Sequence, residues 1–343
     1  MVMTFLARWR DYLISSKEGA IIARSAKIYF VIGKGGTGKT TTASSLALAA
    51  AKRGKRVLLV SLDQAHNLGD VLGQELLSSP VEIGNNLSAL EFDLEKARQE
   101  YLVKTKQQLK SLYKHLSIFN LNNLFDIMAD SPGMEEFIML DSIIKLLKSG
   151  GEYDMVIFDT APTGTTLKIL NLPQLTGRWI TELIKIRKKI LKQRDSIGNI
   201  MGKGARNIEG EKELPLSQKG DAVLRKLEDY YQEMEWVNNT LKNPVVSESI
   251  IILNNDQLSL LETMRIINKL REQGIYVNSL FLNKWRKNDN KYHLEEMLNR
   301  EYDGLNIIKQ RELGVELLER KDLLKIGENI YNNIIKQEVD SDG

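Results

Sequence analysis

Residues 33–42 read GKGGTGKTTT and follow at once on the apolar run KIYFVIG at 27–33. The pattern G-x-x-x-x-G-K-[ST] of a phosphate-binding loop is met here by Gly33, Gly38, Lys39 and Thr40. Such a loop needs a strand before it and a helix after it, because glycine amides and the helix dipole must converge on phosphate oxygens. The run therefore predicts a buried strand over 27–33, a helix that begins at Lys39, and a nucleotide site between the two.

Six further apolar runs of strand length follow along the chain. They lie at 55–63, 87–93, 153–161, 249–254, 277–283 and 305–309. Helical patterns separate them, such as the one at 259–274. Strands that alternate with helices indicate a doubly wound α/β fold, in which a mostly parallel sheet carries helices on both faces. With the phosphate loop, this pattern predicts a P-loop NTPase.

Two stretches interrupt the alternation, because they have helical patterns but no evident strand. They lie at about 94–150 and 172–245. We expect both to pack together as a helical subdomain inserted in an ATPase domain at 27–343. A helical extension at 1–26 is predicted to precede that domain.

Large apolar residues are frequent in the two insertions. They include Met128, Met134, Phe137, Met139, Ile144, Trp179, Leu183 and Met201. Methionine and leucine can repack around varied partners, which suits a surface that accepts different hydrophobic helices. The alternative is an ordinary helical core. We expect Phe137 and Ile144 to belong to such a client-binding face, and the polar segment 201–220 to be a mobile loop.

The composition excludes several kinds of chemical site. The chain has 343 residues, a formal net charge of +3 and no cysteine, which excludes disulfides, zinc sites built on thiolates and thiol chemistry. No stretch approaches the ~20 apolar residues that cross a bilayer. The first residues do not resemble a secretory signal either. We therefore expect a cytoplasmic protein. The basic run at 185–194 is most simply a solvated helix face; lipid headgroups, a charged partner or nucleic acid are the alternatives.

Two aspartates end apolar strands. Asp63 follows the run RVLLVSL, and Asp159 closes MVIFD, which is the Walker B arrangement. Ligands bind at the carboxyl ends of parallel strands. Asp63 can therefore orient or deprotonate an attacking water, while Asp159 and Thr40 can hold Mg²⁺. A helix cap after the strand is the structural alternative for each aspartate.

Several longer segments carry a resemblance. In chain order they are GKGGTGKTT, DQAHNLGDVLG, FDTAPTGTTLKILNLP, LLETMRIINKL and VNSLFLNK. As a set they resemble the family of arsenite-pump ATPases and tail-anchored-protein targeting ATPases, which belongs to the deviant Walker A ATPases. The resemblance extends over nearly the whole chain and is weakest in the helical insertions. It implies an ATP-hydrolysing homodimer in which Lys34, the second lysine of the loop, reaches the partner's nucleotide.

The same resemblance implies a site made of named residues, with ATP and Mg²⁺ as cofactors. Asp63 and Lys34 would be catalytic, and Thr40 and Asp159 would hold the metal. Residues 159–164 would form a second switch, Asn283 would contact adenine, and Asp256 would lie near the nucleotide. The complete nucleotide-binding set is Gly33, Lys34, Gly35, Gly36, Thr37, Gly38, Lys39, Thr40, Thr41, Asp256 and Asn283.

Three features depart from the family pattern. Gln64 stands where proline is usual, Thr165 stands where histidine is usual, and the missing cysteines leave neither arsenite ligands nor a zinc clasp. The leading function is the nucleotide-dependent sheltering of transmembrane helices of tail-anchored clients, with a membrane receptor as a further partner. The alternatives are a regulatory ATPase of an ion or oxyanion pump, and a partition- or positioning-type ATPase on DNA or a membrane surface. Nucleic acid ranks lowest, since no base-reading motif is present.

Overall fold

The structure is a computed structural model. It describes residues 26–65, 67–112, 131–149, 152–201, 221–285, 294–302, 304–312 and 319–341. Two predicted segments lie almost entirely outside these ranges. Of the predicted extension at 1–26 only residue 26 is described, and of the predicted loop at 201–220 only residue 201. No helix within the described ranges is long and apolar enough to cross a membrane.

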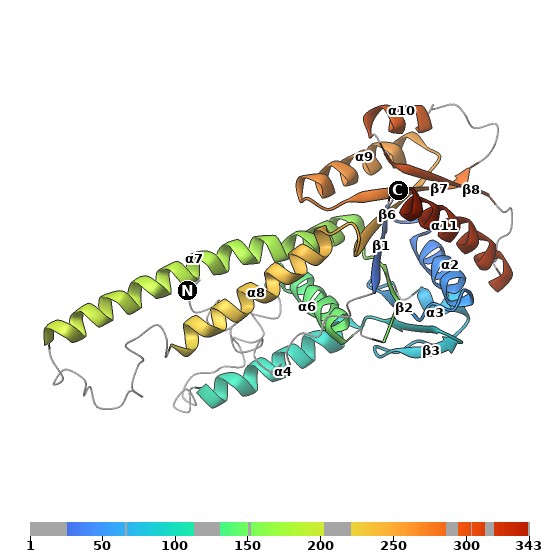
Figure 1. Cartoon of the computed structure of the whole chain (residues 1–343). Coiled ribbons are helices and arrows are strands. Elements are labelled where there is room, and N and C mark those ends of the chain that lie inside the picture. The colour runs from blue at the N-terminus through green and yellow to red at the C-terminus, as the bar shows by residue number, and fades with distance from the viewer. Residues whose placement is uncertain are drawn as a thin grey trace. The chain divides into compact units, whose positions relative to one another are not determined.

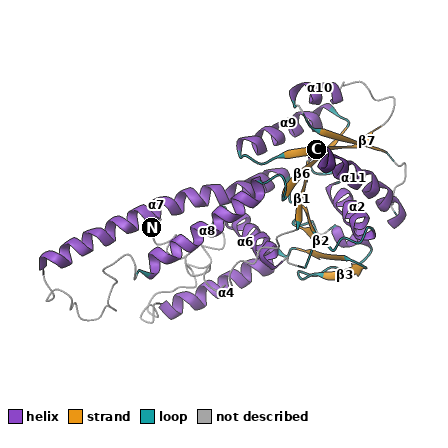
Figure 2. Ribbon diagram, viewed as in Figure 1, coloured by secondary structure: helices purple, strands orange, loops and turns teal. Residues whose placement is uncertain are grey.

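One sheet of eight strands is found among the described residues (Figures 1 and 2), in the order β3-β4-β2-β5-β1-β6-β7-β8. The strands are β1 Lys27–Gly33, β2 Val57–Ser61, β3 Val81–Gly84, β4 Leu87–Glu91, β5 Met155–Asp159, β6 Ser247–Asn254, β7 Val277–Trp285 and β8 Asn306–Arg311. All neighbours are parallel except β3, which runs antiparallel to β4. Every residue of β2 and β5 is buried, as expected for strands covered on both faces. The predicted α/β P-loop fold is confirmed.

Helices connect the strands. They are α2 Lys39–Lys52, α3 Leu68–Leu72, α4 Leu94–Leu112, α6 Met134–Ser149, α7 Thr163–Met201, α8 Ala222–Lys242, α9 Gln257–Glu272, α10 Leu294–Glu301 and α11 Arg320–Ser341. The alanine-rich sequence of α2 favours a helix, and this helix ends just before Gly54, whose φ is +82°. The side chain of Asp256 caps α9 by accepting a hydrogen bond from the Ser259 amide (2.8 Å).

The main hydrophobic core joins α2 and α11 to one face of the sheet. Gly327 of α11 makes this packing possible, because a Cβ at this position would overlap the carbonyl group of Ser45 in α2. Arg53, which follows α2, also places its guanidinium 4.5 Å from the ring centroid of Tyr331 in α11. Helix α2 is therefore enclosed between the sheet and a second helix at close backbone distance.

The chain divides into two compact units. Unit 1 contains residues 1–19, 99–131 and 171–239, and unit 2 contains residues 20–98, 132–170 and 240–343. The whole sheet belongs to unit 2, whereas the described part of unit 1 comes from α4, α7 and α8. The predicted division into an ATPase domain and a helical subdomain with insertions at about 94–150 and 172–245 remains a proposal.

Helix α6 corrects one expectation. The sequence placed Phe137 and Ile144 on a client-binding face, but their exposed fractions are 4% and 5%, and α6 lies within unit 2. Leu140 and Leu147 on the same face are buried as well. The apolar face of α6 is therefore buried in this structure and does not present an exposed client-binding surface.

Candidate active site

The phosphate loop joins β1 to α2 through two glycines with a left-handed backbone. Gly36 has a φ of +79° and Gly38 a φ of +97°, which glycine adopts without steric cost. The Thr37 hydroxyl donates a hydrogen bond to the Lys34 carbonyl oxygen (2.8 Å) and tightens the turn. Because Gly38 caps α2 without a side chain, the first amides of this helix can face an anionic ligand.

Neighbouring elements hold the loop in this shape. Asn283 of β7 donates from Nδ2 to the Thr37 carbonyl oxygen (2.8 Å), and the Thr163 hydroxyl at the start of α7 donates to the Gly33 carbonyl oxygen (3.1 Å). A Cβ at Gly33 would lie 2.5 Å from the Ile252 carbonyl oxygen of β6, so this position requires glycine. The structure thus places Asn283 as a support of the loop, while its predicted contact with adenine remains a prediction.

The two lysines of the loop have different surroundings. Lys39 is 7% exposed at the start of α2. The Lys34 side chain is 41% exposed, and its Nζ lies 3.8 Å from Oε2 of Glu262 in α9. An ion pair this exposed contributes at most about 1 kcal/mol. Lys34 can therefore exchange Glu262 for another anion at small cost, whereas Lys39 is confined beside the loop.

Asp159 ends β5, between β1 and β2. The residue is fully buried, and neither of its carboxylate oxygens has a hydrogen-bond partner with good geometry. Burial, the largest influence, raises the pKa of Asp159 to about 6, although the Thr40 hydroxyl and the Lys39 charge act to lower it. The negative charges of Asp63 and Glu91 contribute to the rise.

This carboxylate fits a role in holding Mg²⁺. An unpartnered buried carboxylate is costly, and a hard cation with oxygen ligands would satisfy it. No group of three His, Asp or Glu side chains that could hold a metal ion occurs among the residues with described positions. Thr40 and Asp159 would therefore share the ion with phosphate oxygens and water, as is usual for Mg²⁺.

Asp63 lies just after β2 on a loop that leads into α3. Its Oδ1 accepts a hydrogen bond from the Ala65 amide (3.2 Å), so in this structure the side chain stabilises its own turn. The backbone before it is attached to β5, because the Leu62 amide donates to the Asp159 carbonyl oxygen (2.8 Å). The two aspartates are thus carried by hydrogen-bonded neighbouring segments at one edge of the sheet.

Asp256 has a clear structural role. It is exposed and caps α9, whereas the sequence placed it near the nucleotide. A cap at this position is worth about 1 kcal/mol. Its proposed role at the nucleotide remains untested.

Glu91 and Glu262 are charged residues of this region that the sequence reasoning did not single out. Glu91 ends β4, and its Oε1 accepts a hydrogen bond from the Gly69 amide (3.0 Å). The run LSALEFD contained a usable signal, since an acid follows the apolar strand as Asp159 follows MVIF. Glu262 offered no such signal, because one acid in an amphipathic helix is most often a solvated residue.

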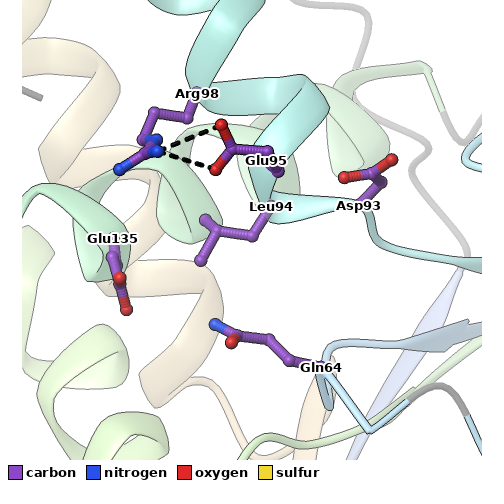
Figure 3. Close-up of a pocket in the computed structure, with 6 residues that line it drawn as sticks. All are labelled: Gln64, Asp93, Leu94, Glu95, Arg98 and Glu135. Atoms are coloured by element: carbon purple, nitrogen blue, oxygen red, sulfur yellow. Dashed lines mark hydrogen bonds and ion pairs between the residues drawn. The ribbon is translucent and has the colours of Figure 1, made fainter.

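A polar cavity of about 270 Å³ lies next to the Asp63 loop and is lined by Gln64, Asp93, Leu94, Glu95, Arg98 and Glu135. Figure 3 shows Gln64 extending from its loop towards Leu94 and Glu135. Three of the polar lining residues are engaged, because Glu95 pairs with Arg98 (2.8 Å) and Asp93 accepts a hydrogen bond from the Lys96 amide (2.9 Å) at the start of α4. Three carboxylates against one guanidinium make this cavity a poor phosphate site.

The buried charge of Asp159 gives a stability prediction. Asp159→Asn is expected to raise the melting temperature at pH 7–8 without magnesium and nucleotide, since a neutral amide avoids a buried unpaired charge. The folded-state pKa of about 6 lies above the ordinary value of 3.8, so the wild-type protein loses stability as the pH rises between them. The rise in melting temperature of Asp159→Asn over wild type should therefore be full above pH 6 and absent below pH 3.8.

Thermal melts from pH 4 to pH 8 measure this gain. Asp154→Asn is the matched control, because the hydrogen bond from Arg56 lowers the pKa of Asp154, and its loss should not stabilise the protein. A lower melting temperature for Asp159→Asn than for wild type at pH 8 would contradict the prediction. The same variant should lose magnesium-dependent ATP hydrolysis if Asp159 holds the ion.

Comparison with known proteins places the chain in a family. The sequence matches the family model described as anion-transporting ATPase over residues 26–313, a range that contains every predicted site residue. It is 34% identical to ATPase GET3 of Malassezia globosa over 263 residues, which cover 76% of this chain and 73% of that protein. It is 29% identical to ATPase get3 of Aspergillus terreus over 341 residues, which cover 94% and 95% of the two chains.

Proposed function

The chain belongs to the anion-transporting ATPase family and is an ATPase, and from this premise we propose that it is a homodimeric targeting factor for tail-anchored membrane proteins. In this proposal the protein shelters the transmembrane helix of a client in a nucleotide-dependent manner and delivers it to a membrane receptor. The similarity to two proteins named ATPase GET3 supports this choice, as does the motif resemblance to targeting ATPases.

The observation that carries the proposal is an exposed apolar stripe on α7. Leu175, Trp179 and Ile186 are all exposed, Trp179 by 58%. Their spacings of four and seven residues place them on one side of the helix over about 16 Å. All three belong to unit 1. Exposed apolar surface of this kind is typical of a binding site for another apolar segment, such as a client helix of ~20 residues.

The nucleotide would act on this stripe through α7. The helix begins at Thr163, directly after the segment 159–162, and the Thr163 hydroxyl contacts the phosphate loop at Gly33 (3.1 Å). A change in residues 159–164 on ATP binding or hydrolysis would therefore reach the first turn of the helix that carries Leu175 and Trp179. Such a two-state change would couple the presence of ATP to client binding.

In the ATPase reaction, the loop amides and Lys39 bind the phosphates, and Asp63 accepts the proton of the attacking water. Thr40 and Asp159 hold Mg²⁺, which supplies charge neutralisation at the phosphates when bound. Lys34 acts on the nucleotide of the partner chain, which requires a symmetric dimer with the two sites facing each other.

The alternative function as the ATPase of an anion pump has support from the family description. The description anion-transporting ATPase favours a chain that drives an anion pump, although the absence of cysteine leaves no thiolate ligands for arsenite. Several-fold stimulation of ATP hydrolysis by a membrane pump subunit, with no retention of a tail-anchored client, would favour this alternative.

Action on DNA or on a membrane surface has less support. Within the basic run 185–194, Lys185 pairs with Glu182 (2.7 Å), Arg187 with the buried Asp221, and Lys188 with Glu228 (3.2 Å). Acidic residues of the same unit thus pair with three of the cations of this run, as on an ordinary helix face.

The double variant Leu175→Ser and Trp179→Ser tests the client site. It should lose co-purification with a co-expressed tail-anchored protein while basal ATP hydrolysis stays within about two-fold of wild type, since exposed positions contribute little to stability. The matched control is Leu77→Ser with Val245→Ser, two exposed apolar positions of unit 2. Client capture by the test variant at the level of the control variant would reject this placement of the client site.

A further inference from the structure

The loop that carries Asp63 is fixed at its beginning by the backbone of both neighbouring strands. The Leu62 amide donates to the Asp159 carbonyl oxygen (2.8 Å), and the Phe92 amide donates to the Ser61 carbonyl oxygen (2.9 Å). These bonds continue the parallel ladders of β2 with β5 and β4. The position of the chain just before Asp63 is therefore set by the sheet.

The other end of the loop is held by a side chain. Oε1 of Glu91 accepts a hydrogen bond from the Gly69 amide (3.0 Å), and the Gly69 carbonyl oxygen accepts one from the Gln74 amide (3.1 Å). Gly69 lies in the first turn of α3, beside the fully buried Leu68. A Cβ at Gly69 would lie 2.9 Å from the Gln74 carbonyl oxygen, so there is little room for this turn to shift.

We propose that Glu91 is a positioning residue of the ATPase reaction, which fixes the far end of the loop at 63–69 through the Gly69 amide and thereby holds Asp63 at the phosphate site. Glu91 does not itself touch the nucleotide. Attachment on both sides, at Leu62 through β5 and at Gly69 through Glu91, limits where Asp63 can lie. Its side chain is therefore already positioned for an attacking water. This inference rests on the proposed role of Asp63.

Glu91 has a second property that the experiment must separate from the first. Its negative charge acts on the buried Asp159, so Glu91 could influence the reaction through charge alone. Two conservative substitutions separate the hydrogen bond to the Gly69 amide from the effect of the charge. Glu91→Gln keeps the length and an oxygen that accepts the Gly69 hydrogen bond, but it loses the charge. Glu91→Asp keeps the charge and is shorter by one methylene group, so it cannot span the distance to the same amide.

Steady-state ATP hydrolysis and nucleotide affinity are measured for both variants of the full-length protein. A positioning role predicts that Glu91→Asp lowers kcat on the order of 10-fold or more, with the Kd of a fluorescent ATP analogue nearly unchanged. Glu91→Gln should stay within about three-fold of wild type, because it retains the acceptor. Amide hydrogen exchange at Gly69 should accelerate in Glu91→Asp and remain slow in Glu91→Gln.

The reverse order, with Glu91→Gln impaired and Glu91→Asp active, would assign Glu91 to a charge effect and overturn the inference. Equal activity of both variants and wild type would overturn it as well. Asp63→Asn is assayed alongside to separate this inference from the proposed mechanism. Normal turnover in Asp63→Asn would reject the role of Asp63 itself. Loss of turnover there, together with full activity in Glu91→Asp, would reject the role of Glu91 alone.

Discussion

Replacement of Asp63 by asparagine is expected to lower kcat by about 10²–10⁴-fold, the usual contribution of a general base. The substitution keeps the shape of the side chain, and its amide oxygen can still accept the Ala65 hydrogen bond seen here at 3.2 Å. The loop should therefore keep its fold while the group that accepts the proton of water is lost. ATP and Mg²⁺ should still bind, so the nucleotide-bound state should accumulate.

Single-turnover hydrolysis and nucleotide binding, measured on the same preparation, separate these effects. Lys39→Ala is the contrasting variant, because the loss of a cation at the phosphate site should weaken nucleotide affinity rather than the chemical step alone. Asp63→Asn with near-normal turnover would restrict Asp63 to stabilising the turn after β2. Loss of ATP binding in that variant would show that the substitution disturbed the site as a whole.

Lys34→Ala is expected to lower turnover by about 10³-fold and to retain nucleotide binding. A cation that the partner chain supplies to stabilise the charge of phosphoryl transfer has an effect of this size. We expect binding to be retained because the Lys34 side chain is 41% exposed and pairs with Glu262 at 3.8 Å, whereas Lys39 is buried beside the loop. On dimer closure Lys34 would exchange Glu262 for the partner's phosphates.

Mixed dimers test whether Lys34 acts across the interface. A dimer of one Lys34→Ala chain and one Asp63→Asn chain contains one complete site if Lys34 works in trans, and none if it works in cis. Random pairing of equal amounts should then restore roughly a quarter of wild-type activity, since half of the dimers are mixed and each has one active site of two. Activity that stays at the level of the separate variants would remove the trans role.

Much of the fold was accessible from the sequence, because buried parallel strands have a strong signal. The runs at 27–33, 87–93 and 153–161 contain β1, β4 and β5. Four or more apolar residues follow one another in the first and the last of these runs, whereas Ser88 and Glu91 interrupt the second. Strand β3 was missed, since Val81–Gly84 has four residues of which one is buried. It pairs with β4 at the edge of the sheet, where tertiary contacts decide the conformation and local pattern does not.

The candidate site was accessible in part. Gly38 and Lys39 belong to a fixed motif whose physics favours a left-handed glycine directly before a helix start, and the structure has both. The support from Asn283, 246 positions along the chain from Thr37, depends on strand order and cannot be read locally. The burial of Phe137 was likewise hidden, because helical spacing reveals an apolar face without revealing what covers it.

The close packing of α2 against α11 has a consequence for how ATP can move this protein. Since Gly327 brings α11 onto the backbone of α2 near Ser45, and since α2 is also buried against the sheet, sliding or rotating α2 would force several backbones apart. We expect the phosphate loop and α2 to serve as the stationary frame of unit 2. The change on nucleotide binding would then be transmitted by the segment at 159–166, which follows β5 and is attached to β1 and the phosphate loop through the hydroxyl groups of Thr160 and Thr163. Mechanical compliance in this fold is thus assigned to the segment that leads from β5 into α7, while the helix that receives the phosphates stays still.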